Sequence, residues 1–161
     1  MNKTEILELF EQLNISYDIV EHPAAYTIEE MDRFAMPNAN QVAKNLFVRD
    51  DKKRSYYLLT IQKDKTVNLK ELRALLNSRP LSFASEDDLL NYLGLHKGAV
   101  TPLGVLNDTE RKVEVIIDED LLPLNNIGIH PNENTATIWI SIEDLLRLIQ
   151  RHGNTVRVAK I

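Results

Sequence analysis

The chain has 161 residues, the usual size of one domain, so we expect a single globular unit over residues 1–161. Hydrophobic residues make up 43% of it and charged residues 27%, and no apolar run approaches the roughly 20 residues that a membrane-spanning helix needs. The lack of cysteine excludes disulfides, thiolate metal sites and cysteine nucleophiles. The N-terminal sequence Met-Asn-Lys-Thr-Glu has no apolar signal core, which favours a cytoplasmic protein.

A formal net charge of −5 excludes a general positive field that would attract nucleic acid, so any polyanion must be bound locally. One dense basic cluster, Lys52-Lys53-Arg54, is joined further along by other basic residues, which are Lys63, Lys65, Lys70 and Arg73. These side chains either solvate a hairpin tip and a helix face or form a rim that faces phosphates.

Helix-period and strand-period segments alternate from the N-terminus onward. Asn2 and Glu5 resemble a capping box and predict a helix to about residue 14, followed by a strand over 17–19. Thr27 and Glu30 predict a second helix that stops before Pro37, and the residues expected to face inward from it are Ile28, Met31, Phe34 and Ala35. Residues 45–49 and 56–61 are rich in β-formers and flank a charged turn, so they predict an antiparallel hairpin.

The second half of the chain continues the alternation. Helices are predicted after the caps Asn68 with Glu71, Ser85 with Asp88, and Ser141 with Asp144, and Gly94 should end the second of these. Strands are predicted over 81–84, 112–118, 135–140 and 155–159, with a loop over 98–104. About six or seven strands surrounded by helices predict an α/β fold with a mixed, curled, barrel-like sheet.

Most strong catalytic signatures are missing. The sequence has no Gly-x-Ser-x-Gly elbow, no phosphate loop ending in Gly-Lys-Ser/Thr, no His-Glu-x-x-His and no Gly-x-Gly-x-x-Gly. The four histidines, at 22, 96, 130 and 152, lack metal-ligand spacing. We therefore expect neither a metal nor a cofactor.

Two segments suggest a binding site. Lys44 stands at the mouth of a predicted buried strand, where an unpaired ammonium is costly unless it meets an anionic ligand or reaches solvent from the strand end. Gly128-Ile129-His130-Pro131 combines a glycine that permits positive φ or close backbone approach with a proline that biases His130 toward extended geometry. The result is a histidine on a stiff turn, which suits a binding site but is also a common way to build a loop.

These segments carry a family resemblance. Lys44-Asn45-Leu46-Phe47, the Gly98–Gly104 loop with Thr101-Pro102-Leu103-Gly104, residues 106–109, and Gly128–Pro131 with 134–137 occur in the order found in the YbaK/prolyl-tRNA-synthetase-associated domain family. The chain is similar over nearly its whole length to the free-standing ProX or PrdX-type deacylases of that family. The resemblance implies the family fold and hydrolysis in trans of mischarged tRNA(Pro), chiefly Ala-tRNA(Pro).

The resemblance also assigns roles by position. Lys44 matches the family's essential lysine and Asn45 its neighbour, and Gly128, His130 and Pro131 match the Gly-x-His-Pro element. Lys44 and His130 are the candidate catalytic residues, and the candidate substrate-binding residues are Asn45, Gly98, Thr101, Pro102, Gly104, Gly128, Ile129 and Pro131. Ile129 occupies a position that varies in the family, which leaves the amino-acid preference open.

The expected mechanism uses water as the nucleophile, because an aminoacyl ester is already activated, with help from the ribose hydroxyl of the substrate. Lys44 should meet the terminal phosphate or ribose, and backbone N–H groups of 128–130 should hold the carbonyl oxygen, while His130 fixes the amino acid or shapes the pocket. The expected partners are the tRNA acceptor end, met by residues 52–54 and by Arg33 on the predicted second helix, and transiently prolyl-tRNA synthetase. The alternatives are a Cys-tRNA(Pro) or other small-amino-acid deacylase, or a non-catalytic aminoacyl-tRNA-binding module.

Overall fold

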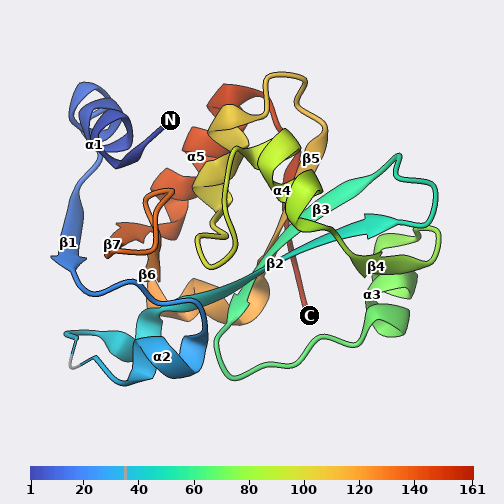
Figure 1. Ribbon diagram of the computed structural model, residues 1–161, viewed down its shortest axis with the longest axis horizontal. Helices are drawn as coiled ribbons and strands as arrows, with labels where there is room; N and C mark the ends of the chain where they lie inside the picture. The colour runs from blue at the N-terminus through green and yellow to red at the C-terminus, as the bar shows by residue number, and fades with distance from the viewer. Residues whose placement is uncertain (35) are drawn as a thin grey trace.

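The computed structural model describes residues 1–34 and 36–161, and its strands form two sheets (Figure 1). The smaller sheet is antiparallel, with the order β1 (Tyr17–Glu21), β7 (Ala136–Ser141) and β6 (Asn126–Ile129). The larger sheet has the order β4 (Leu81–Phe83), β2 (Ala43–Asp50), β3 (Tyr56–Gln62), β5 (Val113–Asp118) and β8 (Val156–Ala159). In it, β2 is antiparallel to β3 and β4, whereas β3, β5 and β8 are parallel, so the predicted mixed α/β fold is confirmed.

The expectation of one sheet curled toward a barrel is wrong. Among the described residues, the link between the two sheets is a single parallel bridge between Val42 and Gly128. Beyond that bridge, β2 pairs with β3 on one edge and, from Val48, with β4 on the other, and no ladder joins it to β6 in the described part of the chain. A Cβ at Gly128 would lie 3.0 Å from both the Trp139 indole nitrogen and Val42 Cγ2, so a larger residue here would have to displace one of these side chains slightly.

Five α-helices begin at the capping residues predicted from the sequence. They are α1 (Lys3–Gln12), α2 (Ile28–Asp32), α3 (Leu69–Leu76), α4 (Glu86–Leu93) and α5 (Ile142–His152). The preceding Asn, Thr or Ser side chain accepts a hydrogen bond from the backbone N–H three residues later in every case. No helix in the described part of the chain is long and apolar enough to span a bilayer.

Two predicted segments differ from the structure, and the inward orientation predicted for Ala35 lies outside the described residues. The helix expected to stop before Pro37 already ends at Asp32. The loop expected over 98–104 gives way at Pro102 to a 3₁₀ helix, η2 (Pro102–Asn107). Two further 3₁₀ helices are η1 (Ala39–Gln41) and η3 (Glu119–Leu124).

The larger sheet is covered on both faces. Neighbouring residues on β3 point to opposite sides, so Leu58 joins one hydrophobic cluster and Leu59 the other. The cluster containing Leu58 also includes buried residues of α1, α4 and α5, whereas the cluster containing Leu59 includes those of α3. The β2–β3 hairpin therefore lies between the two hydrophobic clusters. Its open end is beside α2 and β6, and its turn is at the opposite end of the molecule (Figure 1).

Candidate functional site

A cavity of about 390 Å³ lies at the open end of the β2–β3 hairpin. It is lined by four groups of residues, which are 25–29 with Met31, 42–46 with Lys63, 97, 98 and 100, and 128–130 with Thr137. Lys44 and His130 both line it. The bridge between Val42 and Gly128 explains this convergence, because β2 and β6 run in the same direction from it and each candidate follows its bridge residue by two positions.

Lys44 is the second residue of β2 and is half-buried at the cavity wall. Its Nζ donates a hydrogen bond to the Lys65 carbonyl oxygen at 3.2 Å. The ammonium has no carboxylate partner within ion-pair distance in the described part of the chain. The neutral Lys65 carbonyl holds the ammonium in place without compensating its charge, so the ammonium can bind an anionic group.

Two further lysines line the cavity, and one of the two forms an ion pair in the described part of the chain. Lys63 pairs with Asp32 at 3.1 Å. Lys97 is exposed and has no ion pair among residues 1–34 and 36–161, while Glu29 contributes one carboxylate to the same wall. The wall therefore carries a local excess of positive charge on a molecule whose net charge is −5.

Asn45 follows Lys44 on the opposite face of the strand and also lines the cavity. Its Oδ1 accepts a hydrogen bond of 2.7 Å from the hydroxyl of Thr60, a fully buried residue of β3. This bond fixes the amide orientation and leaves the Nδ2 hydrogens as donors. The site thus contains an oriented neutral donor beside a cation.

His130 follows directly after β6 and is half-buried. Its Nδ1 lies 2.8 Å from the Ala136 carbonyl oxygen, which requires a proton on Nδ1 and leaves Nε2 as an acceptor in the neutral ring. Burial lowers the pKa of His130 below its ordinary value, the charge of His22 lowers it further, and the bond to Ala136 opposes the shift. His130 is therefore neutral at pH 7 and can accept a hydrogen bond from a substrate ammonium.

His22 and Thr137 stand behind His130. The His22 and His130 ring centroids are 6.0 Å apart, and His22 Nε2 lies 2.8 Å from the hydroxyl of Thr137, which lines the cavity. His22 Nδ1 lies 2.8 Å from the Pro23 carbonyl oxygen, so a neutral His22 accepts from Thr137. Neither residue was predicted from the sequence to belong to the site. The one signal for His22 is the repeated His-Pro dipeptide at 22–23 and 130–131.

Six of the ten predicted site residues line the cavity and four do not. Besides Lys44 and His130, the cavity wall includes Asn45, Gly98, Gly128 and Ile129. Thr101, Pro102, Gly104 and Pro131 are buried outside it. For Thr101, Pro102 and Gly104 the physical reason is that η2 and its N-cap turn into the core, where a Cβ at Gly104 would lie 2.6 Å from Leu95 Cδ1.

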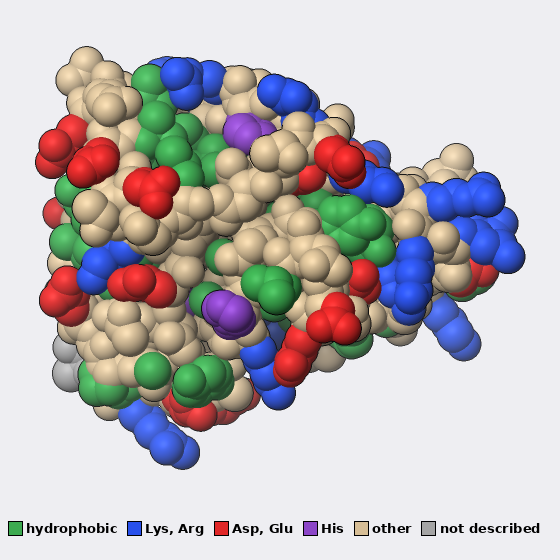
Figure 2. All heavy atoms as spheres, turned by 45° about the horizontal axis from the view of Figure 1, so that its top comes forward, with side chains coloured by type: hydrophobic (Ala, Val, Ile, Leu, Met, Phe, Trp, Pro, Cys, Tyr) green, Lys and Arg blue, Asp and Glu red, His purple; other side chains and the backbone are tan. Residues whose placement is uncertain are grey.

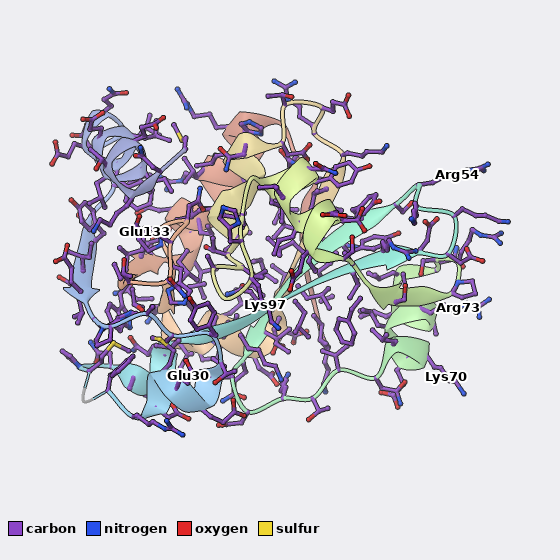
Figure 3. The ribbon with its side chains drawn as sticks, in the orientation of Figure 1. Glu30, Arg54, Lys70, Arg73, Lys97 and Glu133 are labelled. Carbon is purple, nitrogen blue, oxygen red and sulfur yellow. The ribbon has the colours of Figure 1, made fainter. Side chains whose placement is uncertain are left out.

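Of the basic residues predicted as a tRNA-binding rim, Lys63 lines the cavity and the others do not. Figure 3 shows Arg54, Lys70 and Arg73 at one end of the molecule, Glu30 toward the other end, and Lys97 between them. Figure 2 shows Lys and Arg side chains gathered at the end that carries Arg54. Lys44 and Lys52 are separated by eight residues of strand and turn, or about 25 Å at the usual rise per residue. Arg33, at the C-cap of α2, lies closer to the cavity in sequence.

The comparison with known proteins identifies the family. The model of the aminoacyl-tRNA editing domain family matches residues 22–148. The prolyl-tRNA editing protein ProX of Acetoanaerobium sticklandii is 43% identical over 159 residues, covering 99% of this chain and 97% of that protein. The prolyl-tRNA synthetase associated domain-containing protein 1 of Danio rerio is 37% identical over 155 residues, covering 95% of this chain and 84% of that protein.

A solved structure shares the fold. A candidate trans-editing enzyme for prolyl tRNA synthetase superposes with a TM-score of 0.74 at 22% identity, covering 98% of this chain and 95% of that one. With the family match, these relatives establish that the chain belongs to the aminoacyl-tRNA editing domain family. It is an aminoacyl-tRNA deacylase, an enzyme that hydrolyses a carboxylic ester.

Proposed function

We propose that residues 1–161 act as one trans-editing unit that hydrolyses mischarged tRNA(Pro), chiefly Ala-tRNA(Pro). The observation that carries the proposal is that Lys44 and His130, distant in sequence, line one cavity with Asn45 and Gly128. The relative from Acetoanaerobium sticklandii, named as a prolyl-tRNA editing protein, supports tRNA(Pro) as the substrate class. Contact with prolyl-tRNA synthetase would be transient.

The need for such an enzyme follows from the small difference in size between alanine and proline. A synthetase site built for proline cannot strongly exclude alanine, since each methylene contributes only about 1 to 3 kcal/mol of discrimination. A second, narrower site can admit alanine and exclude proline by shape. Apolar side chains of Val42, Val100 and Ile129 line the present cavity and are suited to set that width.

The proposed reaction requires positioning rather than a protein nucleophile. A water oxygen attacks the ester carbonyl, the bond to the ribose oxygen breaks, and the ribose oxygen takes up a proton, releasing alanine and free tRNA. The neighbouring ribose hydroxyl orients the water. Backbone N–H groups of 128–130 stabilise the negative charge that develops on the carbonyl oxygen.

His130, Lys44 and Asn45 would each contact a different part of the substrate. The substrate α-ammonium would donate to His130 Nε2, the acceptor left free by the bond to Ala136. The same ammonium would repel Lys44, so Lys44 meets the terminal phosphate or ribose. Asn45 Nδ2 then donates to an oxygen of the ester or ribose, because Thr60 already occupies its Oδ1. This arrangement holds the ester in reactive geometry.

Replacing Lys44 tests the proposal directly. Lys44→Ala is expected to lose most turnover of Ala-tRNA(Pro), on the order of 10²-fold, as for the loss of one preorganised charged donor. The matched control is Lys112→Ala, which removes an exposed lysine beside β5, outside the cavity. The assay is release of radiolabelled alanine, and wild-type hydrolysis by Lys44→Ala would refute the assignment.

A panel of misacylated tRNAs separates the alternatives. Preferred hydrolysis of Cys-tRNA(Pro), or of another small amino acid, would rename the substrate and keep the mechanism. Binding of aminoacyl-tRNA without hydrolysis of any ester would identify a non-catalytic module. The proposal expects Ala-tRNA(Pro) to react fastest and Pro-tRNA(Pro) to be spared.

A further inference from the structure

Tyr26 is an aromatic residue at the cavity whose side chain is exposed to solvent. It lines the cavity, yet 58% of its surface is exposed. Its backbone is nonetheless fixed, because Tyr26 N donates to Glu30 Oε2 at 2.8 Å and the preceding residue, Ala25, exchanges two hydrogen bonds with Asn134. An ordered, exposed aromatic ring at a substrate cavity suggests that a ligand covers it.

The Tyr26 ring packs directly against Gly98. Gly98 has φ +88°, in the left-handed region, and a Cβ there would lie 2.6 Å from Tyr26 Cδ1 and 3.2 Å from Tyr26 Cα. Any larger residue would push the ring away. Gly98, predicted from the sequence to be a substrate-binding residue, thus supports Tyr26.

The surroundings of the ring match the chemistry of a nucleotide. Lys97 precedes Gly98 in the chain and is exposed without an ion pair among the described residues, and Lys63 lines the same cavity. Sites that bind single-stranded nucleic acid combine an aromatic ring, on which a base stacks, with cations that meet the backbone. The carboxylate of Glu29 on the same wall is matched by the lysines around it.

We propose that the Tyr26 ring, supported by Gly98, stacks against the adenine of the 3′-terminal adenosine, with Lys97 facing its phosphate. This inference rests on the proposed function, because that adenosine carries the ester. With alanine in the cavity, its nucleoside must lie at the opening, where Tyr26 is exposed. The site would therefore read the terminal nucleoside independently of the rest of the tRNA.

Two small esters test the base contact. Full-length protein is assayed with 2′(3′)-O-alanyl-adenosine and with alanyl-anhydroerythritol, an ester that keeps the neighbouring cis-hydroxyl of the ribose ring but has no base. Tyr26→Ala is expected to lower kcat/KM for the adenosine ester by about 5- to 100-fold, the equivalent of losing one base stack. Hydrolysis of the ester without a base should be far less affected. Tyr26→Phe keeps the ring and should restore the rate on the adenosine ester.

The control is Phe83→Ala, which removes an equally exposed aromatic ring, at 57%, from β4 outside the cavity. An equal loss on both esters in Tyr26→Ala would mean that the ring only supports the pocket wall, and no loss on either would exclude contact. Either result overturns the proposal.

A binding measurement separates this proposal from the deacylase function. An unacylated Cyt-Cyt oligonucleotide ending in 2-aminopurine should lose fluorescence on binding wild-type protein, because stacking quenches the base. Tyr26→Ala should abolish the quenching. If the wild type hydrolyses no ester but quenches through Tyr26, the deacylase function fails and base binding stands. Equal quenching by both proteins contradicts the base contact.

Discussion

The imidazole of His130 is held in its neutral form by the fold. Burial lowers its pKa, with a further contribution from the charge of His22, against the opposing effect of the hydrogen bond to Ala136. The unfolded chain therefore takes up this proton at a higher pH than the folded chain does. The neutral ring contributes fully to stability above about pH 6.5, the ordinary value, and the contribution is lost as the pH falls toward the lower folded pKa.

We accordingly predict that acidification destabilises the protein partly through His130. Between pH 7.5 and pH 5, the free energy of unfolding in urea should fall more for wild type than for His130→Asn, which can still donate to Ala136 but does not titrate. His96→Asn, at an exposed histidine, is the control and should keep the wild-type slope. Identical pH dependence in wild type and His130→Asn would show that this imidazole is not the group responsible.

Which site residues could be predicted depended on their sequence neighbourhood. Lys44 and His130 could be proposed as candidates because each stands in a distinctive local motif, and the resemblance then linked the two. Tyr26 and Thr137 carry no local signal, since their position at the cavity depends on tertiary contacts with Gly98 and His22. The same limit applies to Thr101 and Pro102, which stay predicted substrate-binding residues, because their local motif does not reveal that η2 turns inward, away from the described cavity.

At the scale of elements, the end of β5 organises the end of β3 and, through it, Lys44. The buried Asp118 accepts hydrogen bonds from Gln62 N at 3.0 Å and from Lys65 Nζ at 2.9 Å. Burial opposes the charge of Lys65, but hydrogen bonds to Asp120 and Asp118 raise its pKa, so it stays protonated. The Lys65 carbonyl oxygen then holds Lys44.

Asp118→Asn is therefore predicted to affect both stability and activity. It should lower the free energy of unfolding by about 1 to 3 kcal/mol, because the buried side chain at 118 loses the charge that pairs with Lys65, and it should lower turnover by loosening Lys44. Asp120→Asn is the matched control, since its carboxylate is 55% exposed and its ion pair with Lys65 is solvent-screened. Chemical denaturation and alanine release are the measurements. Equal stability of the two variants would contradict a structural role for Asp118.

Helix starts were predicted well because capping is local. In all five cases the donor and acceptor lie three residues apart, so the sequence contains the whole interaction. Strand β6 was missed because four residues including a glycine give little pattern of their own. It becomes a strand by pairing with β7, and because its contact with β2 is limited to the single bridge at Val42, the described strands form two sheets and not the expected barrel.

Across the whole molecule, the two ends of the β2–β3 hairpin have different surfaces. The open end holds the cavity, with a few lysines placed singly around it. The turn carries Lys52, Lys53 and Arg54, all exposed, and α3 adds Lys70 and Arg73 beside it. A net charge of −5 gives no general attraction for RNA, so a tRNA bound with its 3′ end in the cavity needs a second positive surface. The hairpin turn, about 25 Å away along β2, is suited to meet phosphates of the acceptor stem.

This arrangement predicts a salt dependence that can be assigned to one surface. Each cation that binds a phosphate releases counterions, so log kcat/KM for Ala-tRNA(Pro) under subsaturating conditions should fall linearly with log salt concentration. Replacing Lys52, Lys53 and Arg54 together by Gln should make that slope shallower by about one for each phosphate-binding cation removed. The effect should be confined to substrates with a stem, because alanyl-adenosine cannot reach the turn. A variant with the wild-type slope on tRNA would place the stem elsewhere, with Arg33, two residues after the cavity-lining Met31, as the next residue to test.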